Sequence, residues 1–306
     1  MKYKFKLIKE EDGIGVVWFA LSFIVIIFTV GLAIDGGRLY ETKAELRKAA
    51  DAAVLSGAQE LEISDSSVTN LVNQILIAHN EQSSLKALLI RPQNKDKITV
   101  ILERNVPLYF MKLFNFDSAP VSVRSSAAIY PISRAIGTVP FGINKDTQFV
   151  YMKRYQLKVD SGDSTIGNFG ILALAGVGGK LYEDALKYGY DSEIKVGDII
   201  DTQTGNVAQK TVNGVNYRID GSPYETGDIT HRDDPRIITI LVYEPYLVTT
   251  NQVKSIRICG FAYFYLEEPM SSKDSTVNGY FIKKVGTGIS DPNVLDCGAY
   301  AIKLVE

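Results

Sequence analysis

Side chains suited to acid–base or metal chemistry are few in this chain of 306 residues, which contains two histidines. His231 lies in the acidic stretch THRDD beside Asp233 and Asp234. An imidazole next to carboxylates could transfer protons or bind a metal, although salt bridges to nearby arginines are the ordinary role of such a loop. His79 closes a predicted helix, where an imidazole has a capping role.

The two cysteines, Cys259 and Cys297, could pair if this part of the chain is exported, or could stay as buried free thiols. The signatures G-x-S-x-G, H-E-x-x-H and C-x-x-C do not occur. The glycine-rich run at 175–181 fails the Walker pattern, and DSGDS at 160–164 has Gly162 where the adhesive metal motif Asp-x-Ser-x-Ser has serine. We therefore expect no catalytic, cofactor-binding or metal-binding residue.

The element that positions the rest is an uncharged apolar run at 13–34. As a helix over 14–34 its 21 residues rise about 32 Å, which matches a hydrocarbon core of roughly 30 Å. We predict a retained single-pass anchor in the cell membrane; a cleaved signal peptide, cut near Gly31-Leu32-Ala33, and a buried core helix are the alternatives. The anchor residues are Ile14, Trp18, Phe19, Leu21, Phe23, Ile27, Val30 and Ile34.

The positive-inside count is a tie, since the tail carries four lysines and four basic residues also follow the span. Because the later charges precede a long domain, which crosses largely regardless of charge, we expect residues 1–12 to form a cytoplasmic tail and the bulk of the chain to be extracytoplasmic. The net charge of the chain is −2, so a basic nucleic-acid-binding surface is not expected.

Directly after the span comes an alanine-rich helical segment with a stripe of small and apolar residues. Small residues on one face let another helix approach closely, so this stripe is either a packing surface for a partner helix or the face that rests on the chain's own domain. The stripe contains Leu39, Leu46, Ala50, Ala53 and Gly57, and Ala49 beside it is a further candidate for helix packing.

The pattern D-x-G-R … L-x-x-A-A-D-A-A-x-L-x-x-A behind a spanning helix resembles the TadE/TadG-like pilus-assembly proteins of tight-adherence (Flp) systems. Its defining residues here are Asp35, Gly37, Arg38, Leu46, Ala49, Ala50, Asp51 and Ala53. The resemblance is clearest over 13–60 and implies a non-catalytic assembly component whose partners are the lipid bilayer and other pilus-assembly subunits. Processed pilins of this class keep a glutamate five residues after the cleaved glycine, whereas Trp18 and Ala20 stand there, which implies a retained component.

The overall prediction is an α+β protein. Residues 35–130 form the helix extension and a small α/β module, residues 131–143 with two prolines and two glycines form a linker, and residues 144–306 form a β-rich extracytoplasmic domain. Helices are expected at 66–79, 180–188 and 207–219, a short apolar helix from Pro107, and two central strands at 236–243 and 255–266.

Two other functions fit the same chain. It could be an anchored extracytoplasmic enzyme that uses His231, Asp233 and Asp234, or a surface adhesin that binds its ligand through exposed tyrosines, of which the chain has 17. The oligomeric state is left open.

Overall fold

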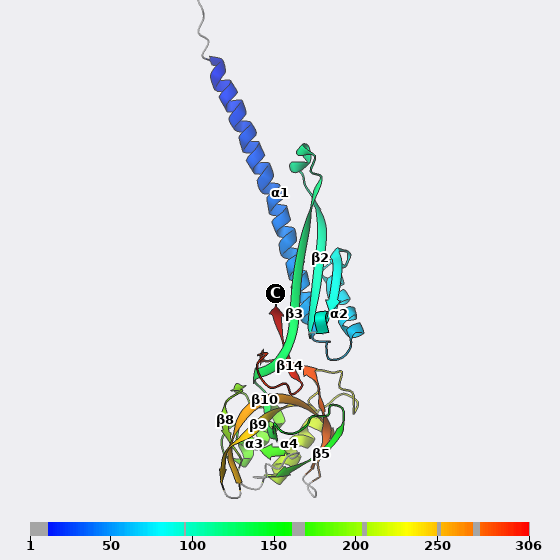
Figure 1. The fold of residues 1–306 in the computed structure, drawn as a ribbon, viewed down its shortest axis with the longest axis vertical. Coiled ribbons are helices and arrows are strands. Elements are labelled where there is room, and N and C mark those ends of the chain that lie inside the picture. The colour runs from blue at the N-terminus through cyan, green and yellow to red at the C-terminus, as the bar shows by residue number, and fades with distance from the viewer. Residues whose placement is uncertain are drawn as a thin grey trace, which may run out of the picture.

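The computed structural model describes residues 12–94, 96–160, 169–203, 207–249, 252–271 and 276–305. A long helix, α1 (Asp12–Ala58), projects from a body that contains two sheets (Figure 1), so the molecule is α+β as predicted. The shorter helices are α2 (Asp65–Ala78), α3 (Gly179–Tyr188) and α4 (Ala208–Asp220), with 3-10 turns η1 (Gln82–Ser84), η2 (Pro92–Asn94) and η3 (Met111–Phe114). The strands are β1 (Leu85–Ile90), β2 (Lys97–Pro107), β3 (Ser118–Ala135), β4 (Thr138–Asn144), β5 (Arg154–Asp160), β6 (Phe169–Ile171), β7 (Ile194–Lys195), β8 (Ile199–Asp201), β9 (Ile237–Thr249), β10 (Gln252–Glu268), β11 (Thr276–Ile282), β12 (Lys284–Val285), β13 (Ile289–Ser290) and β14 (Ala299–Val305).

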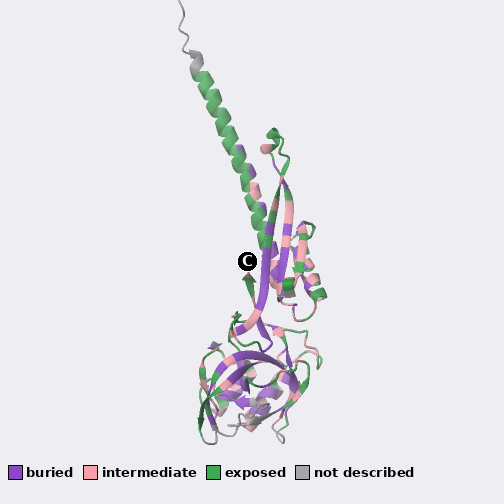
Figure 2. Ribbon diagram, viewed as in Figure 1, coloured by how far each residue is buried: buried purple, intermediate pink, exposed green. Residues whose placement is uncertain are grey.

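Helix α1 joins the apolar run to the alanine-rich segment without a break. Its 47 residues correspond to about 70 Å at 1.5 Å per residue. Residues 16–30 are exposed along the projecting half, and burial begins at Gly31 (Figure 2). The helix therefore has an unpartnered apolar half and a half that packs on the body.

The first sheet packs against the C-terminal half of α1. Its strand order is β1-β2-β3-β14-β12, and β13 and β7 pair with other parts of β3. Strands β2 and β3 form a long antiparallel hairpin that runs alongside α1 (Figure 1). Helix α2 begins one residue earlier than predicted, because the Ser64 hydroxyl caps it by accepting the Ser67 N–H at 3.1 Å.

The short helix expected from Pro107 is instead the tip of this hairpin. Pro107 is the last residue of β2, opposite Ser118, and the turn η3 lies at the tip. Proline has no N–H to contribute to a ladder, so it is compatible with the end of a strand as well as with the start of a helix. A short helix is present within the predicted stretch as η3, but it begins at Met111 and not at Pro107.

The linker expected at 131–143 is not found, because these residues lie mostly in β3 and β4. Pro131 and Pro140 lie at positions where the backbone acts as an acceptor. Their carbonyls accept hydrogen bonds from the N–H groups of Asp291 and Leu172, respectively, at 3.0 Å each. Prolines of this kind do not interrupt a strand. Gly137, at φ +82°, makes the turn between the two strands, where an L side chain would be strained.

The last strand returns to the first sheet. Strand β14 pairs antiparallel with β3, from Tyr300 opposite Pro131 to Val305 opposite Ser126. The predicted domain of residues 144–306 therefore does not fold entirely by itself, since its C-terminal strand completes the sheet beside α1. The composition of a strand does not predict which other strand it will pair with.

The second sheet closes into a barrel below the first (Figure 1). Its order is β11-β5-β6-β4-β9-β10-β8, and an additional pairing of β11 with β10 closes the ring. Phe141, Phe264 and Phe281 are fully buried in its core, against which α3 and α4 pack. Strands β9 and β10 contain the predicted central strands and are buried on both faces through residues 238–243 and 260–266.

Candidate functional site

The apolar half of α1 is exposed to a degree that a water-soluble body does not tolerate. Trp18 is 67% exposed and Phe19 74%, and by length and composition the helix is able to cross a membrane. The hydroxyls of Ser22 and Thr29 donate to the carbonyls of Trp18 and Ile26 at 2.8 Å, so both are satisfied inside the helix. Of the predicted anchor residues, Trp18, Phe19, Leu21, Phe23, Ile27, Val30 and Ile34 are exposed, and the side chain of Ile14 lies outside the described part.

Asp35 marks the point where the apolar half ends and the packed half begins. Its carboxylate accepts the N–H of Tyr109 at 2.8 Å, of Phe110 at 2.9 Å and of Met111 at 2.8 Å. These three donors belong to the tip of the β2–β3 hairpin, and the Asp35 side chain is buried beneath it. The aspartate therefore caps the turn at the tip much as an N-cap residue satisfies the first N–H groups of a helix.

The bond from Met111 N–H is the main reason that the pKa of Asp35 lies below its ordinary value. The bonds from Tyr109 and Phe110 and the charge of Arg38 act in the same direction, while desolvation opposes them. Asp35 is thus held as a carboxylate at neutral pH, which is the form that accepts all three bonds.

Arg38 contacts the same hairpin one helical turn further on. Its guanidinium donates to the Pro107 carbonyl at 2.8 Å and lies 4.1 Å from the centre of the Tyr109 ring. The carbonyl of Pro107 and the N–H groups that follow it are therefore bound by a single face of α1. Gly37, between the two motif residues, has open space around it, and nothing in the structure explains it.

A second pair of motif contacts lies four turns along α1. The Ser125 hydroxyl donates to Asp51, Arg47 pairs with Asp51 at 3.1 Å, and Arg47 also donates to the Arg124 carbonyl at 3.1 Å. We call Asp35, Arg38, Arg47 and Asp51, with their partners on β2, β3 and the tip, the helix clamp. It ties α1 to the hairpin at both ends of their contact.

Along the packed half of α1, small residues let the helix approach the sheet. Leu46, Ala50 and Ala53 of the predicted stripe, and Ala49 beside them, are all fully buried in one core with α2, β2 and β3. A Cβ on Gly57 would lie 2.6 Å from Val72 of α2 and 2.7 Å from Ile98 of β2. Of the two interpretations of the stripe, the structure supports packing on the chain's own domain and corrects the expectation of a surface for a partner helix.

Comparison with known families covers this segment. Residues 15–60 match the family model of putative Flp pilus-assembly TadE/G-like proteins. The chain therefore contains a TadE/G-like segment, as the sequence pattern predicted. No curated protein and no solved structure matches the chain.

The TadE/G-like segment contains the α1 half of the helix clamp and all of the small-residue stripe. Its hairpin partners lie outside the matched range, between residues 107 and 125. The match thus describes one side of an intramolecular interface. Sequence reasoning identified Asp35, Arg38 and Asp51 as a pattern, but it missed their partners because each bond spans about 70 residues or more.

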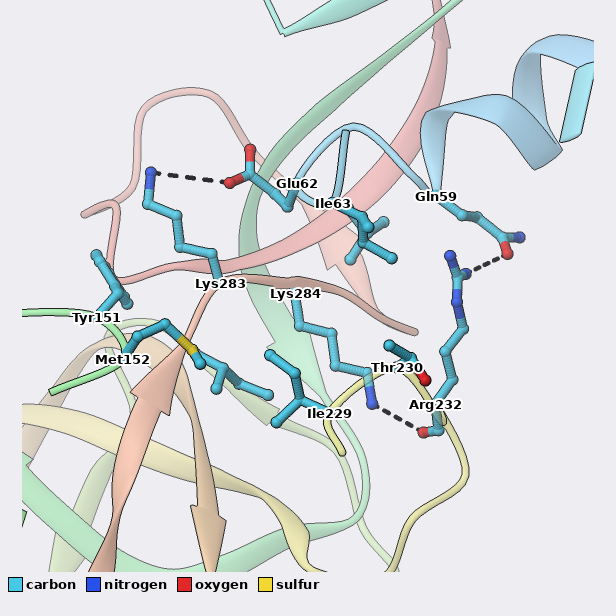
Figure 3. Close-up of a pocket in the computed structure, with 12 residues that line it drawn as sticks. Gln59, Glu62, Ile63, Tyr151, Met152, Ile229, Thr230, Arg232, Lys283 and Lys284 are labelled. Carbon is cyan, nitrogen blue, oxygen red and sulfur yellow. Dashed lines mark hydrogen bonds and ion pairs between the residues drawn. The ribbon is translucent and has the colours of Figure 1, made fainter. Parts of the chain in front are cut away.

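Just beyond the C-terminal end of α1, polar and charged side chains at residues 59–62 are bonded to the barrel. Arg232 bonds Gln59, and Lys283 lies 3.8 Å from Glu62 (Figure 3). Arg232 also pairs with Glu60 at 2.6 Å. Gln59, Glu62, Arg232 and Lys283 line a cleft of about 400 Å³ between the two parts of the body. Its charged side chains are paired within the chain, so we interpret it as a structural junction.

Lys284 lines the same cleft, and its ammonium donates to the Arg232 carbonyl at 2.8 Å (Figure 3). Burial lowers the pKa of Lys284 to about 8, and the charge of Arg232 contributes to the shift. The junction was not anticipated from the sequence, because its members come from three distant parts of the chain.

The loop considered for catalysis holds its three residues in local contacts. The His231 ring stacks on Tyr224 with centroids 3.8 Å apart, and its Nε2 lies 3.2 Å from Asp228. Asp233 accepts from the Tyr224 hydroxyl at 2.9 Å, whereas Asp234 is buried and accepts the Arg236 N–H at 2.9 Å. His231 and Asp233 thus both contact Tyr224, whereas Asp234 is engaged with Arg236.

The two cysteines are free thiols, so the pairing considered from the sequence is not formed. Cys297 is buried, and burial raises its pKa to about 12, which keeps the thiol protonated and unreactive. His79 is the C-cap of α2, as expected from its position. Among the described residues no group of three potential metal ligands occurs, and the DSGDS run at 160–164 lies largely outside them.

Proposed function

We propose that this protein is a single-pass membrane component of a Flp (tight-adherence) pilus-assembly apparatus that acts by assembly and not by catalysis. Residues 1–12 are cytoplasmic, and the sheet and the barrel are extracytoplasmic. In this role α1 anchors the protein, and the folded body contacts other pilus-assembly subunits or the cell envelope.

The observation that supports this proposal best is the coincidence of three boundaries on α1. Uninterrupted exposure of the apolar stretch ends at residue 30, the first contacts with the hairpin come at Phe28 and Gly31, and the clamp begins at Asp35. All three lie inside the TadE/G-like segment. A helix that is bare on one side of this point and locked to a body on the other suits a tether that transmits the position of the body to the bilayer.

The orientation is supported by the length of the body that follows the span. Four basic residues stand on each side of the span, but a long domain is translocated largely regardless of its charges, so the four lysines of the tail favour a cytoplasmic N-terminus. Protease added to spheroplasts tests this directly. We expect digestion of the body and protection of an N-terminal fragment, with a cytoplasmic protein as the control for intact membranes; protection of the body would contradict the proposal.

Retention of the N-terminus is supported by Trp18 and Ala20, which stand where processed pilins carry glutamate. The intact mass of protein purified from membranes should correspond to a chain that keeps the residues before Ile14. Loss of the first 13 or 15 residues, as expected for cleavage after Gly13 or Gly15, would instead identify a processed filament subunit.

The non-catalytic role is tested in cells that depend on the pilus. A triple substitution of His231, Asp233 and Asp234 by alanine, asparagine and asparagine should leave pilus number and surface attachment unchanged when protein levels are equal. Substitution of Asp35 by alanine should reduce both, because it removes the acceptor of three bonds that connect the anchor to the body. The opposite pattern would indicate an anchored enzyme.

A further inference from the structure

The tip of the β2–β3 hairpin, residues 108–117, exposes apolar side chains that the proposed function does not use. Leu113 is 77% exposed, Tyr109 66%, Phe116 58% and Phe114 52%. A water-soluble loop of this length rarely presents so many large apolar side chains together. The tip therefore requires an apolar environment that the chain itself does not supply.

The contacts of the tip with α1 define its depth relative to the span. The ring of Phe28 lies 5.5 Å from that of Phe110 and 5.9 Å from that of Phe114, both in edge-on contact. Phe28 precedes Asp35 by seven residues, which is about 10 Å along a helix. A span over 14–34 fills a core of roughly 30 Å, so Phe28 and the two rings that touch it lie at the level of the acyl chains.

Gly31 makes this approach feasible. A Cβ at that position would lie 2.1 Å from the Phe110 ring, so only glycine lets the ring rest on the helix backbone. The tip is thus seated against the span itself and is not merely near it.

The backbone of the tip is compatible with lipid, because most of its N–H groups are bonded within the chain. Unsatisfied N–H groups are costly in a bilayer, and irregular backbone is tolerated there only when it is satisfied by protein. Asp35 accepts from Tyr109, Phe110 and Met111, and Arg38 donates to the Pro107 carbonyl. The N–H groups of Leu108, Leu113, Asn115 and Phe116 donate to the carbonyls of Asp117, Phe110, Lys112 and Met111, in that order.

The polar side chains of the tip suit the headgroup boundary. Lys112 and Asp117 are 68% and 79% exposed and lie 3.9 Å apart, and Asn115 turns the chain at φ +68°. A lysine can extend its aliphatic stem along apolar surface while its ammonium reaches the headgroups, and tyrosine is common at the same level. The tip therefore has the composition of an interfacial element.

We propose that the hairpin tip inserts into the bilayer beside α1, in the leaflet at the C-terminal end of the span, as a second membrane contact. Lipid is the occupant because the exposed side chains are continuous with the lipid-facing surface of α1 and lie at the same depth. With two contacts, the body is held at a fixed tilt and height above the membrane. The proposal depends on α1 crossing a bilayer, as stated under the proposed function.

Tryptophan fluorescence tests the insertion in the full chain reconstituted into phosphatidylcholine–phosphatidylglycerol vesicles. Trp18 is the single tryptophan of the chain and lies in the span, so the native protein reports on the span alone. In the Trp18→Phe background, Leu113→Trp reports on the tip, and Phe116→Trp repeats the measurement at a second exposed position. We expect both tip variants to show blue-shifted emission, strong quenching by lipids brominated on the acyl chains, and little quenching by aqueous iodide.

The matched control is Tyr188→Trp in the Trp18→Phe background, because Tyr188 is 68% exposed on α3 of the barrel. It should be quenched by iodide and not by brominated lipids. A tip variant that behaves like this control would overturn the proposal, as would one shielded from both quenchers, which would indicate contact with a second copy of the chain. If native Trp18 itself escapes brominated lipids, the span and the proposed function fail first.

Discussion

The half of the molecule around α1 and the barrel are stabilised in opposite ways. In the first, the buried face of the helix consists mostly of alanines with one glycine, one leucine and one valine in the core, and charged groups such as Asp35 and Asp51 bond the helix to the hairpin. In the barrel, large rings such as Phe264 and Phe281 fill the interior. A single helix on a sheet buries few large side chains, so its position depends on close backbone approach and on specific hydrogen bonds. A closed barrel has a large interior, and the packing of large side chains there fixes its structure.

The largest effect is expected in the barrel core. Phe281→Ala removes a fully buried ring that meets Phe149, Tyr155 and Phe264 at centroid distances of 4.8, 5.1 and 5.1 Å. We expect a loss of about 3–5 kcal/mol in the free energy of unfolding, since a cavity of this size cannot collapse. Denaturant unfolding of the detergent-solubilised chain, followed by tyrosine fluorescence, measures it; a loss near zero would show that the barrel is not stabilised by volume.

An intermediate effect is expected where α1 meets α2. Gly57→Leu would force a side chain into Val72 and Ile98, and we expect a loss of about 1–3 kcal/mol from overpacking. Gly36→Leu is the matched control, because it is the same change in the same helix with open space around it. Helix propensity should make that control neutral or stabilising by up to about 1 kcal/mol. Equal losses in both variants would contradict close packing as the reason for glycine.

A smaller effect is expected from one bond of the clamp. Ser125→Ala removes the hydroxyl that donates to Asp51 and should cost about 1 kcal/mol in the same unfolding measurement. Ser118→Ala, at the exposed end of β3, serves as the control. If the two variants unfold alike, the Ser125 bond contributes nothing and the clamp is held by Asp35 and Arg38.

The smallest effect is expected from the acid dependence of the clamp, which has no effect at neutral pH but tests the clamp most directly. The pKa of Asp35 is below its ordinary value of 3.8 in the folded chain, so its contribution is complete above that pH and is lost as the pH falls through the folded value. The emission of Trp18→Phe, Leu113→Trp should change in this acid range and not between pH 5 and pH 8. Adding Asp35→Asn should remove that transition, and a transition that persists would have to come from another carboxylate.

Glu183 in the barrel half gives a comparison for the same titration. Bonds from Lys187 and then Lys210 lower its pKa to about 2, so its contribution is also lost in acid, between 4.5 and about 2. Because Glu183 links α3 to α4 and lies far from the tip in the chain, Asp35→Asn should leave its titration intact. Acid sensitivity can in this way be assigned to each half separately.

Elements with a strong local pattern were predicted well. The expected helices at 180–188 and 207–219 correspond to α3 and α4, and Gly189 ends α3 at φ +86°. The two apolar runs became the central strands β9 and β10. The misassigned stretches contain prolines, at 107 and at 131–143, where the same residue suits a strand end, a helix start or a turn.

The sequence alone was enough to predict the apolar span, the helix that continues from it, the small-residue stripe and the family to which residues 15–60 are similar. The tertiary structure was needed to show which surface the stripe covers, that Asp35 binds N–H groups 74 to 76 residues away, and that β14 pairs with β3. The physical reason is that the periodicity of a segment shows which of its faces is apolar. Which other segment packs on that face depends on all the segments that could bind there.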